Sequence, residues 1–101
     1  MQDEKIQLRF DPGKFYITTG AAAALQRNET DGALQIMRHL RCDWGDVCVD
    51  DSDMNDEALE NGSRILSSYD LQDGTKIWII TEAVGADGAR GGTTILLPEE
   101  Y

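Results

Sequence analysis

Two β-rich runs joined by an Asp-Gly turn constrain the fold of this chain more than any other feature. Residues 65–71 read ILSSYDL and residues 76–84 read KIWIITEAV, with Asp73 and Gly74 between them. Asp-Gly between two such runs favours a tight β-hairpin, because both residues tolerate positive φ angles. Residues 77–80 are all apolar, which is typical of a strand covered on both faces. We therefore expect a hairpin whose second strand is central in its sheet.

Further strands are expected on both sides of this hairpin. Residues 93–98 read TTILLP and follow the glycine-rich segment 85–92, which predicts a third antiparallel strand after a flexible hairpin loop. Near the start, apolar residues alternate with polar ones from Ile6 to Phe10 until Asp-Pro-Gly forces a turn. Residues 1–14 are therefore expected to form a loosely attached strand, and a second short strand follows at residues 15–17.

Between the N-terminal segment and the hairpin, capping residues and helical spacing predict up to three short helices. Their expected limits are residues 20–27 with Thr19 as N-cap, from Thr30 or Asp31 to residues 44–45, and from Ser52 or Asp53 to Gly62. Residues 1–101 are thus predicted to form one α+β domain. Two to three short helices pack on a three- to four-stranded, mainly antiparallel sheet that ends in a β-meander.

Composition excludes several classes of function. The chain has 101 residues, with 9 Lys and Arg against 19 Asp and Glu, giving a net charge of -10. This charge repels nucleic acid and anionic membranes, so direct binding to either is not expected. No segment approaches the roughly 18 continuous apolar residues of a membrane helix. The first ten residues contain early acids and no apolar signal core, which predicts a cytoplasmic protein with reduced cysteines.

Five segments carry a resemblance to a known family. They read ITTGAAAAL, RHLRCDWGDVC, NDEALENGSRILSSY, DGTKIWIITEA and TTILLPEEY. Over residues 17–101 the chain resembles small bacterial proteins usually labelled plasmid-related or hypothetical, some of which carry the name of a type I restriction-modification subunit. The resemblance implies a cytoplasmic accessory protein of mobile DNA and no established activity. The chain departs from the family pattern at Cys42, where the family has glycine, and in its longer loop VGADGARGG.

The only histidine, His39, lies close in sequence to Cys42 and Cys48, and all three are metal-ligand types. Structural zinc usually needs paired Cys-x2-4-Cys knuckles, which are absent, so an aspartate would have to complete the site. A cysteine nucleophile is disfavoured because the surrounding carboxylates raise a thiol's pKa. We predict no catalytic residue, metal site or cofactor. A small metal-dependent or Cys/His hydrolase that uses His39, Cys48 and nearby aspartates is the alternative.

Residues 51–55 fit the first half of an EF-hand calcium loop. The match fails at its two most informative positions, because Asp56 stands where glycine is required and Gly62 stands where glutamate is required. A loose cation site is the most that this segment predicts.

The remaining feature is an acidic run of eight carboxylates between Arg41 and Arg64, with no lysine or arginine among them. They are Asp43, Asp46, Asp50, Asp51, Asp53, Asp56, Glu57 and Glu60. One interpretation is a patch that docks on a basic protein surface, even imitating DNA in the groove of a nucleic-acid-binding protein. The other is a solvated face that keeps the protein soluble.

From the first interpretation we predict a non-enzymatic accessory protein that binds its partner through the acidic run. The residues expected to contact the partner are Trp44, Asp46, Asp50, Asp51, Asp53 and Asp56. Trp44 has two interpretations of its own, a core anchor that closes the second helix over the sheet or an exposed anchor in the contact. A further alternative is a homodimer that pairs the free edge of the meander.

Overall fold

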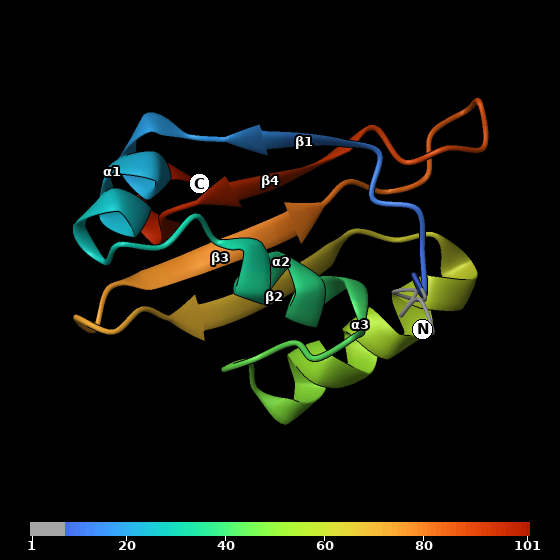
Figure 1. Cartoon of the computed structure of the whole chain (residues 1–101). Coiled ribbons are helices and arrows are strands. Elements are labelled where there is room, and N and C mark those ends of the chain that lie inside the picture. The colour runs from blue at the N-terminus through green and yellow to red at the C-terminus, as the bar shows by residue number, and fades with distance from the viewer. Residues whose placement is uncertain (1–7) are drawn as a thin grey trace, which may run out of the picture.

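Four strands in the order β1-β4-β3-β2 form the sheet of this computed structural model, which describes residues 8–101 (Figure 1). The strands are β1 (Lys14–Ile17), β2 (Ile65–Asp70), β3 (Lys76–Thr81) and β4 (Gly92–Leu96). The pairs β2-β3 and β3-β4 are antiparallel, whereas β1 is parallel to β4. The predicted α+β fold with a mainly antiparallel sheet is confirmed, and β1 makes the sheet mixed.

The predicted hairpin is formed by β2 and β3. Asp70 pairs with Lys76, and the turn between them contains Gly74 with a φ of 89°. Strand β3 lies between β2 and β4, as its apolar run predicts. Ile77 and Ile79 are buried under the helices, while Trp78 on the other face packs edge-on against Tyr101 at 5.8 Å. Both faces of the central strand are therefore covered.

Three helices cover one face of the sheet (Figure 1): α1 (Thr19–Arg27), α2 (Ala33–Leu40) and α3 (Val49–Asn61). Helix α1 begins one residue early because the Thr18 side chain accepts a hydrogen bond from the Ala21 N–H. Helix α2 ends at Leu40, before the predicted residues 44–45. Cys42 ends the helix, because its φ of 67° turns the chain. Its own N–H then donates to the His39 carbonyl, and the Asp43 N–H donates to the Arg38 carbonyl. This is a Schellman ending with cysteine at the usual glycine position.

Helix α3 begins four to five residues earlier than predicted, since Ser52 or Asp53 is its predicted N-cap. Its N-cap is Cys48, which makes no side-chain capping bond, and Asp50 and Asp51 occupy the first turn. Negative charge in this turn is stabilising because it faces the positive end of the helix dipole. The helix ends at Gly62 with a φ of 80°, as predicted.

The predicted strand near the N-terminus is wrong for the residues that the structure describes. Residues 8–10 are not in a strand, and Ile6 lies outside the described range. Phe10 instead packs its ring beside His39 and Trp44. The strand begins only after the turn at Gly13, and its residues Phe15 and Ile17 are those expected for the second short strand.

The segment between β3 and β4 is anchored by Arg90, which is buried. Its guanidinium donates hydrogen bonds to the carbonyls of Ser63, Glu82 and Ala58. The Ala58 carbonyl lies in the last turn of α3, so Arg90 supplies a cation at the negative end of that helix dipole. The tip of the segment closes through a bond from the Gly85 N–H to the Ala89 carbonyl.

Candidate functional site

The outward face of α3 carries a row of four carboxylates, which we call the acidic stripe: Asp50, Asp53, Glu57 and Glu60. Their spacing of three, four and three residues places them on one side of a helix. All four are exposed. The opposite side of α3 is buried through Asn55 and Ala58. The burial of α3 thus forces these four charges outward together.

Some carboxylates of the acidic run form an ion pair with a lysine or arginine, and others do not. Asp43 bonds Arg38, with 2.7 Å between Nε and Oδ2, and this contact lowers the pKa of Asp43. Asp46 accepts a bond from the Lys76 ammonium at 2.9 Å. Within residues 8–101, no lysine, arginine or histidine lies within 4.0 Å of an α3 carboxylate. In the described chain the α3 carboxylates therefore form no direct ion pair, and the cations beside them are Arg9 and Arg41, which line a pocket together with Asp56 and Glu60.

Two of the six predicted contact residues do not belong to this surface. Trp44 is 5% exposed and packs with Ala58 and Ile65, so the core interpretation holds and its side chain is not available to a partner. Asp46 lies before α3 and is exposed, but it forms an ion pair with Lys76, so its contact with a partner stays a prediction. This ion pair has a tertiary cause, because Lys76 comes from the start of β3 and no local pattern pairs it with Asp46.

The other four predicted residues lie on α3. Asp50 and Asp53 are in the acidic stripe, and Asp51 and Asp56 are exposed beside it. The predicted set did not include Glu57 and Glu60, which complete the acidic stripe. Their signal was the 3-4-3 spacing, which becomes visible only once the helix begins at Val49 rather than near Asp53.

The stripe sits on a firmly attached helix. The Asn55 amide donates to the Leu66 carbonyl at 2.8 Å and accepts from the Leu66 N–H at 3.1 Å. The Trp44 indole N–H donates to the Asp56 carboxylate at 3.0 Å. These bonds tie α3 to β2 and to the core. The backbone that carries the stripe is therefore held in place against the rest of the fold.

His39 is fully buried, and both ring nitrogens are hydrogen bonded. Nδ1 contacts the Ser67 hydroxyl and Nε2 contacts the Thr81 hydroxyl at 2.8 Å. Thr81 in turn bonds Thr93, which donates to the Pro12 carbonyl. The Pro12 carbonyl can only accept, so the Thr93 hydroxyl donates to it and must accept from the Thr81 hydroxyl. Thr81 therefore accepts from the Nε2–H of His39, and Nδ1 is the acceptor for the Ser67 hydroxyl. Burial lowers the pKa of His39 to about 3, so the ring is neutral.

The geometry does not assemble the alternative hydrolase or zinc site. Cys48 is exposed at the start of α3, whereas Cys42 is half-buried and burial raises the pKa of its thiol. Across residues 8–101 there is no group of three or more His, Cys, Asp and Glu side chains that could hold a metal ion. Residues 51–55 lie inside helix α3, which cannot adopt the turn of an EF-hand loop.

No protein-family model, curated protein or solved structure matches this chain. In residues 8–101 no helix has the length and apolar content required to cross a bilayer. The functional assignment therefore depends on the chemistry of the surface itself.

We expect Glu57→Lys to stabilise the protein by about 1 kcal/mol, because it replaces two repulsions with two attractions. Glu57 lies four residues after Asp53 and three before Glu60, and like charges at these distances destabilise a helix. Thermal unfolding should show a midpoint about 4–8 °C higher. The control is Glu29→Lys, an equal charge change between α1 and α2. An equal gain in the control would mean that net charge, rather than the stripe, is relieved.

Proposed function

We propose that this chain is a non-enzymatic binding protein whose acidic stripe docks on the basic surface of a partner protein. The observation that supports this most directly is the absence of any cation within 4.0 Å of the α3 carboxylates in the described chain. The stripe also costs helix stability through its like-charge neighbours. A surface that is kept at a cost in stability is typical of a functional one.

The geometry of the stripe favours a partner that normally binds nucleic acid. The Cβ atoms of neighbouring residues in the stripe lie about 5–6 Å apart, and at about 1.5 Å per residue the row extends about 15 Å along the helix. Lys and Arg side chains that bind phosphates form the same charge-assisted bonds with carboxylates. The stripe therefore imitates a short phosphate track, and the partner's nucleic-acid groove is its proposed docking place.

The resemblance to plasmid-related proteins suggests a biological role for this docking. An accessory protein of mobile DNA that occupies a DNA-binding groove would act as an inhibitor of a nucleic-acid-binding protein. Both cysteines are free thiols, which is consistent with a cytoplasmic location.

The test is affinity capture from a bacterial lysate with the full chain, compared with two variants of equal charge. Asp53→Asn with Glu57→Gln removes two charges from the stripe, whereas Glu82→Gln with Glu99→Gln removes two elsewhere. We expect the stripe variant to lose the captured protein, with affinity lowered about tenfold or more. The control variant should retain it.

Capture that is equal for both variants would contradict docking through the stripe. The finer proposal of DNA imitation has its own readout. An excess of a 20-base-pair DNA duplex should release the captured protein by competing for the same groove. A partner that binds the duplex and this chain together would exclude the DNA-mimic proposal and leave simple docking in place.

A further inference from the structure

The outer edge of β1 offers unpaired main-chain groups. The Thr18 N–H donates to the Ile95 carbonyl, and the amide groups of alternate residues point to opposite sides of a strand. Tyr16 therefore faces β4 like Thr18, whereas the N–H and C=O of Phe15 and Ile17 point away from the sheet. Within the described part of the chain, β1 pairs with β4 alone. This edge can accept a further strand.

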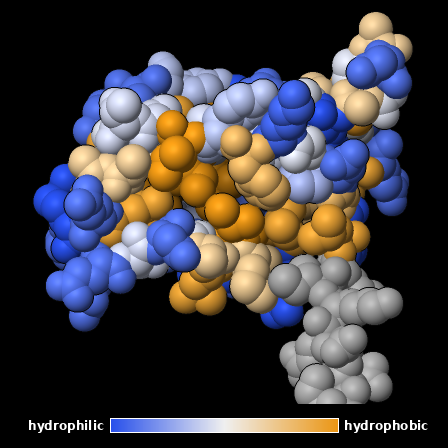
Figure 2. Space-filling view, turned by 45° about the horizontal axis from the view of Figure 1, so that its top comes forward, coloured by the Kyte–Doolittle hydropathy of each residue, from blue (hydrophilic) through white to orange (hydrophobic). Residues whose placement is uncertain are grey.

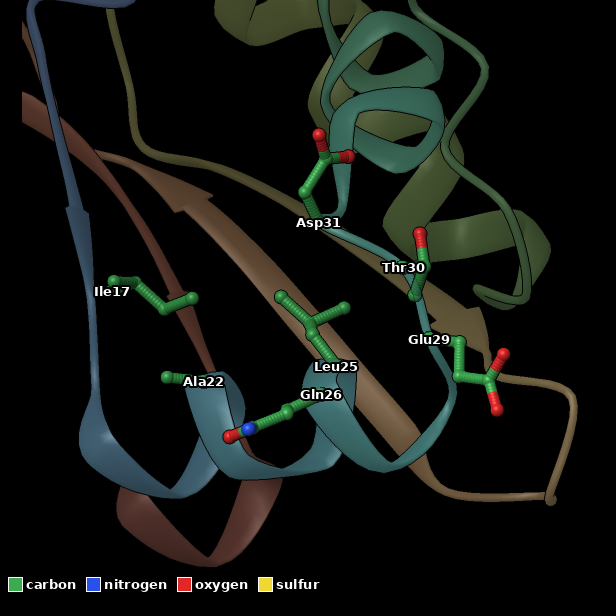
Figure 3. Close-up of a pocket in the computed structure, with 7 residues that line it drawn as sticks. All are labelled: Ile17, Ala22, Leu25, Gln26, Glu29, Thr30 and Asp31. Carbon is green, nitrogen blue, oxygen red and sulfur yellow. The ribbon is translucent and has the colours of Figure 1, made fainter.

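A pocket lies beside this edge. It has a volume of about 690 Å³, and its apolar lining residues are Ile17, Ala22 and Leu25. In Figure 3 the Ile17 side chain extends from β1 toward Leu25 on α1. The same residue thus supplies a free main-chain edge and one wall of an apolar pocket.

The surface around the pocket is also apolar. Phe15 is 50% exposed and Ile17 is 48% exposed, and both lie on the helix side of the sheet, like their register partners Thr93 and Ile95. Figure 2 shows hydrophobic side chains gathered in a continuous band across this face, with polar margins. An exposed apolar band next to an open strand edge favours association with an extended chain.

The negative charge around the pocket indicates what kind of segment can bind there. Glu29 and Asp31 line the rim of the pocket together with the neutral residues Gln26 and Thr30. The whole chain carries a net charge of -10. This net charge and the two pocket carboxylates disfavour a second copy of the chain at this edge and favour a cationic occupant.

We propose that the outer edge of β1 binds an extended, cationic segment of a partner protein by strand addition, with one aliphatic side chain of that segment in the pocket beside Ile17. Main-chain hydrogen bonds to Phe15 and Ile17 supply the pairing, the pocket selects the aliphatic residue, and the acidic rim selects Lys or Arg next to it. This site is separate from the acidic stripe and does not depend on the function proposed for it.

The probe is a synthetic nine-residue peptide with acetylated and amidated ends, in which Lys alternates with Val or Ile. It is titrated into the ¹⁵N-labelled full chain carrying Asp53→Asn and Glu57→Gln, which weakens attraction to α3. We expect saturable shifts of the Phe15 and Ile17 amide resonances and slower hydrogen exchange at both. Ile17→Thr should weaken binding about tenfold, since it shortens the wall of the pocket. Leu34→Thr, at an exposed apolar residue outside the pocket, should leave binding unchanged.

Two control peptides test the mode of binding. A peptide N-methylated at every residue has no N–H left to donate on either edge and cannot pair with a strand, and a peptide with Glu in place of Lys has the wrong charge. Both should fail to bind. Equal binding of either peptide, shifts confined to α3, or no shift at β1 would overturn the proposal. Concentration-dependent shifts of β1 without peptide would also overturn it, because they would show that a second copy occupies the edge.

Discussion

Lowering the pH from 7.5 to 4.5 is expected to reduce the free energy of unfolding by about 2–3 kcal/mol, and the loss arises from His39. The pKa of His39 falls from 6.5 in the unfolded chain to about 3 in the fold because the ring is buried. Between these values the unfolded state binds the proton and the folded state does not. Stability is therefore full above pH 6.5 and is lost as the pH falls toward 3.

Urea titrations at a series of pH values measure this loss. His39 is the only histidine, so within the described chain no other side chain has an ordinary pKa between 5 and 8. His39→Gln keeps a donor and an acceptor for Ser67 and Thr81 and should remove most of this loss, leaving the smaller part that comes from carboxylates with a lowered pKa, such as Glu100. A histidine ring resonance that titrates near pH 6.5 in the folded wild-type protein would contradict the prediction.

Gly45→Ala should destabilise the protein by about 3 kcal/mol or more, because it combines backbone strain with a clash. Gly45 has a φ of 74°, and a Cβ atom there would overlap the Ser68 carbonyl oxygen and lie 2.6 Å from the Tyr69 ring. The glycine lets the chain run along the edge of β2. The Ser68 N–H donates to the Trp44 carbonyl at 3.0 Å, and the Asp46 N–H donates to the Ser68 carbonyl at 2.7 Å.

Gly74→Ala is the matched control for this substitution. Its φ is 89°, but nothing lies within 4 Å of the added Cβ atom. It should cost about 1–2 kcal/mol, which is the penalty of the left-handed conformation alone. Urea unfolding followed by tryptophan fluorescence compares the two variants. Equal losses would show that the edge of β2 tolerates the side chain and that the close approach of Gly45 is not important.

Local patterns predict the elements whose cause is local. The Asp73-Gly74 turn and the apolar run of β3 identify the hairpin, and Gly62 marks the end of α3. The end of α2 could not be predicted in this way. Cysteine has no preference for the left-handed conformation, so the sequence at Cys42 does not predict the turn that ends the helix.

The candidate site could be predicted from the sequence only in part, for the same reason. A count of charges finds the acidic run, but not which carboxylates lie side by side, because that depends on the residue at which α3 begins. The pairing of Asp46 with Lys76 is a tertiary contact. The buried chain from His39 to Pro12 joins side chains from α2, β2, β3 and β4. No short segment of sequence contains enough of it to be recognised.

The parallel pairing of β1 with β4 has a consequence for the order of folding. The β2-β3 hairpin closes a short loop and is expected to form early, since local contacts lose little chain entropy. Strand β1 must wait for a partner from the far end of the chain, with Ile17 in register with Ile95. During synthesis the ribosome therefore releases β1 long before β4. Until then its apolar side chains have no sheet to join, which makes this period the one in which a nascent chain most needs protection from aggregation.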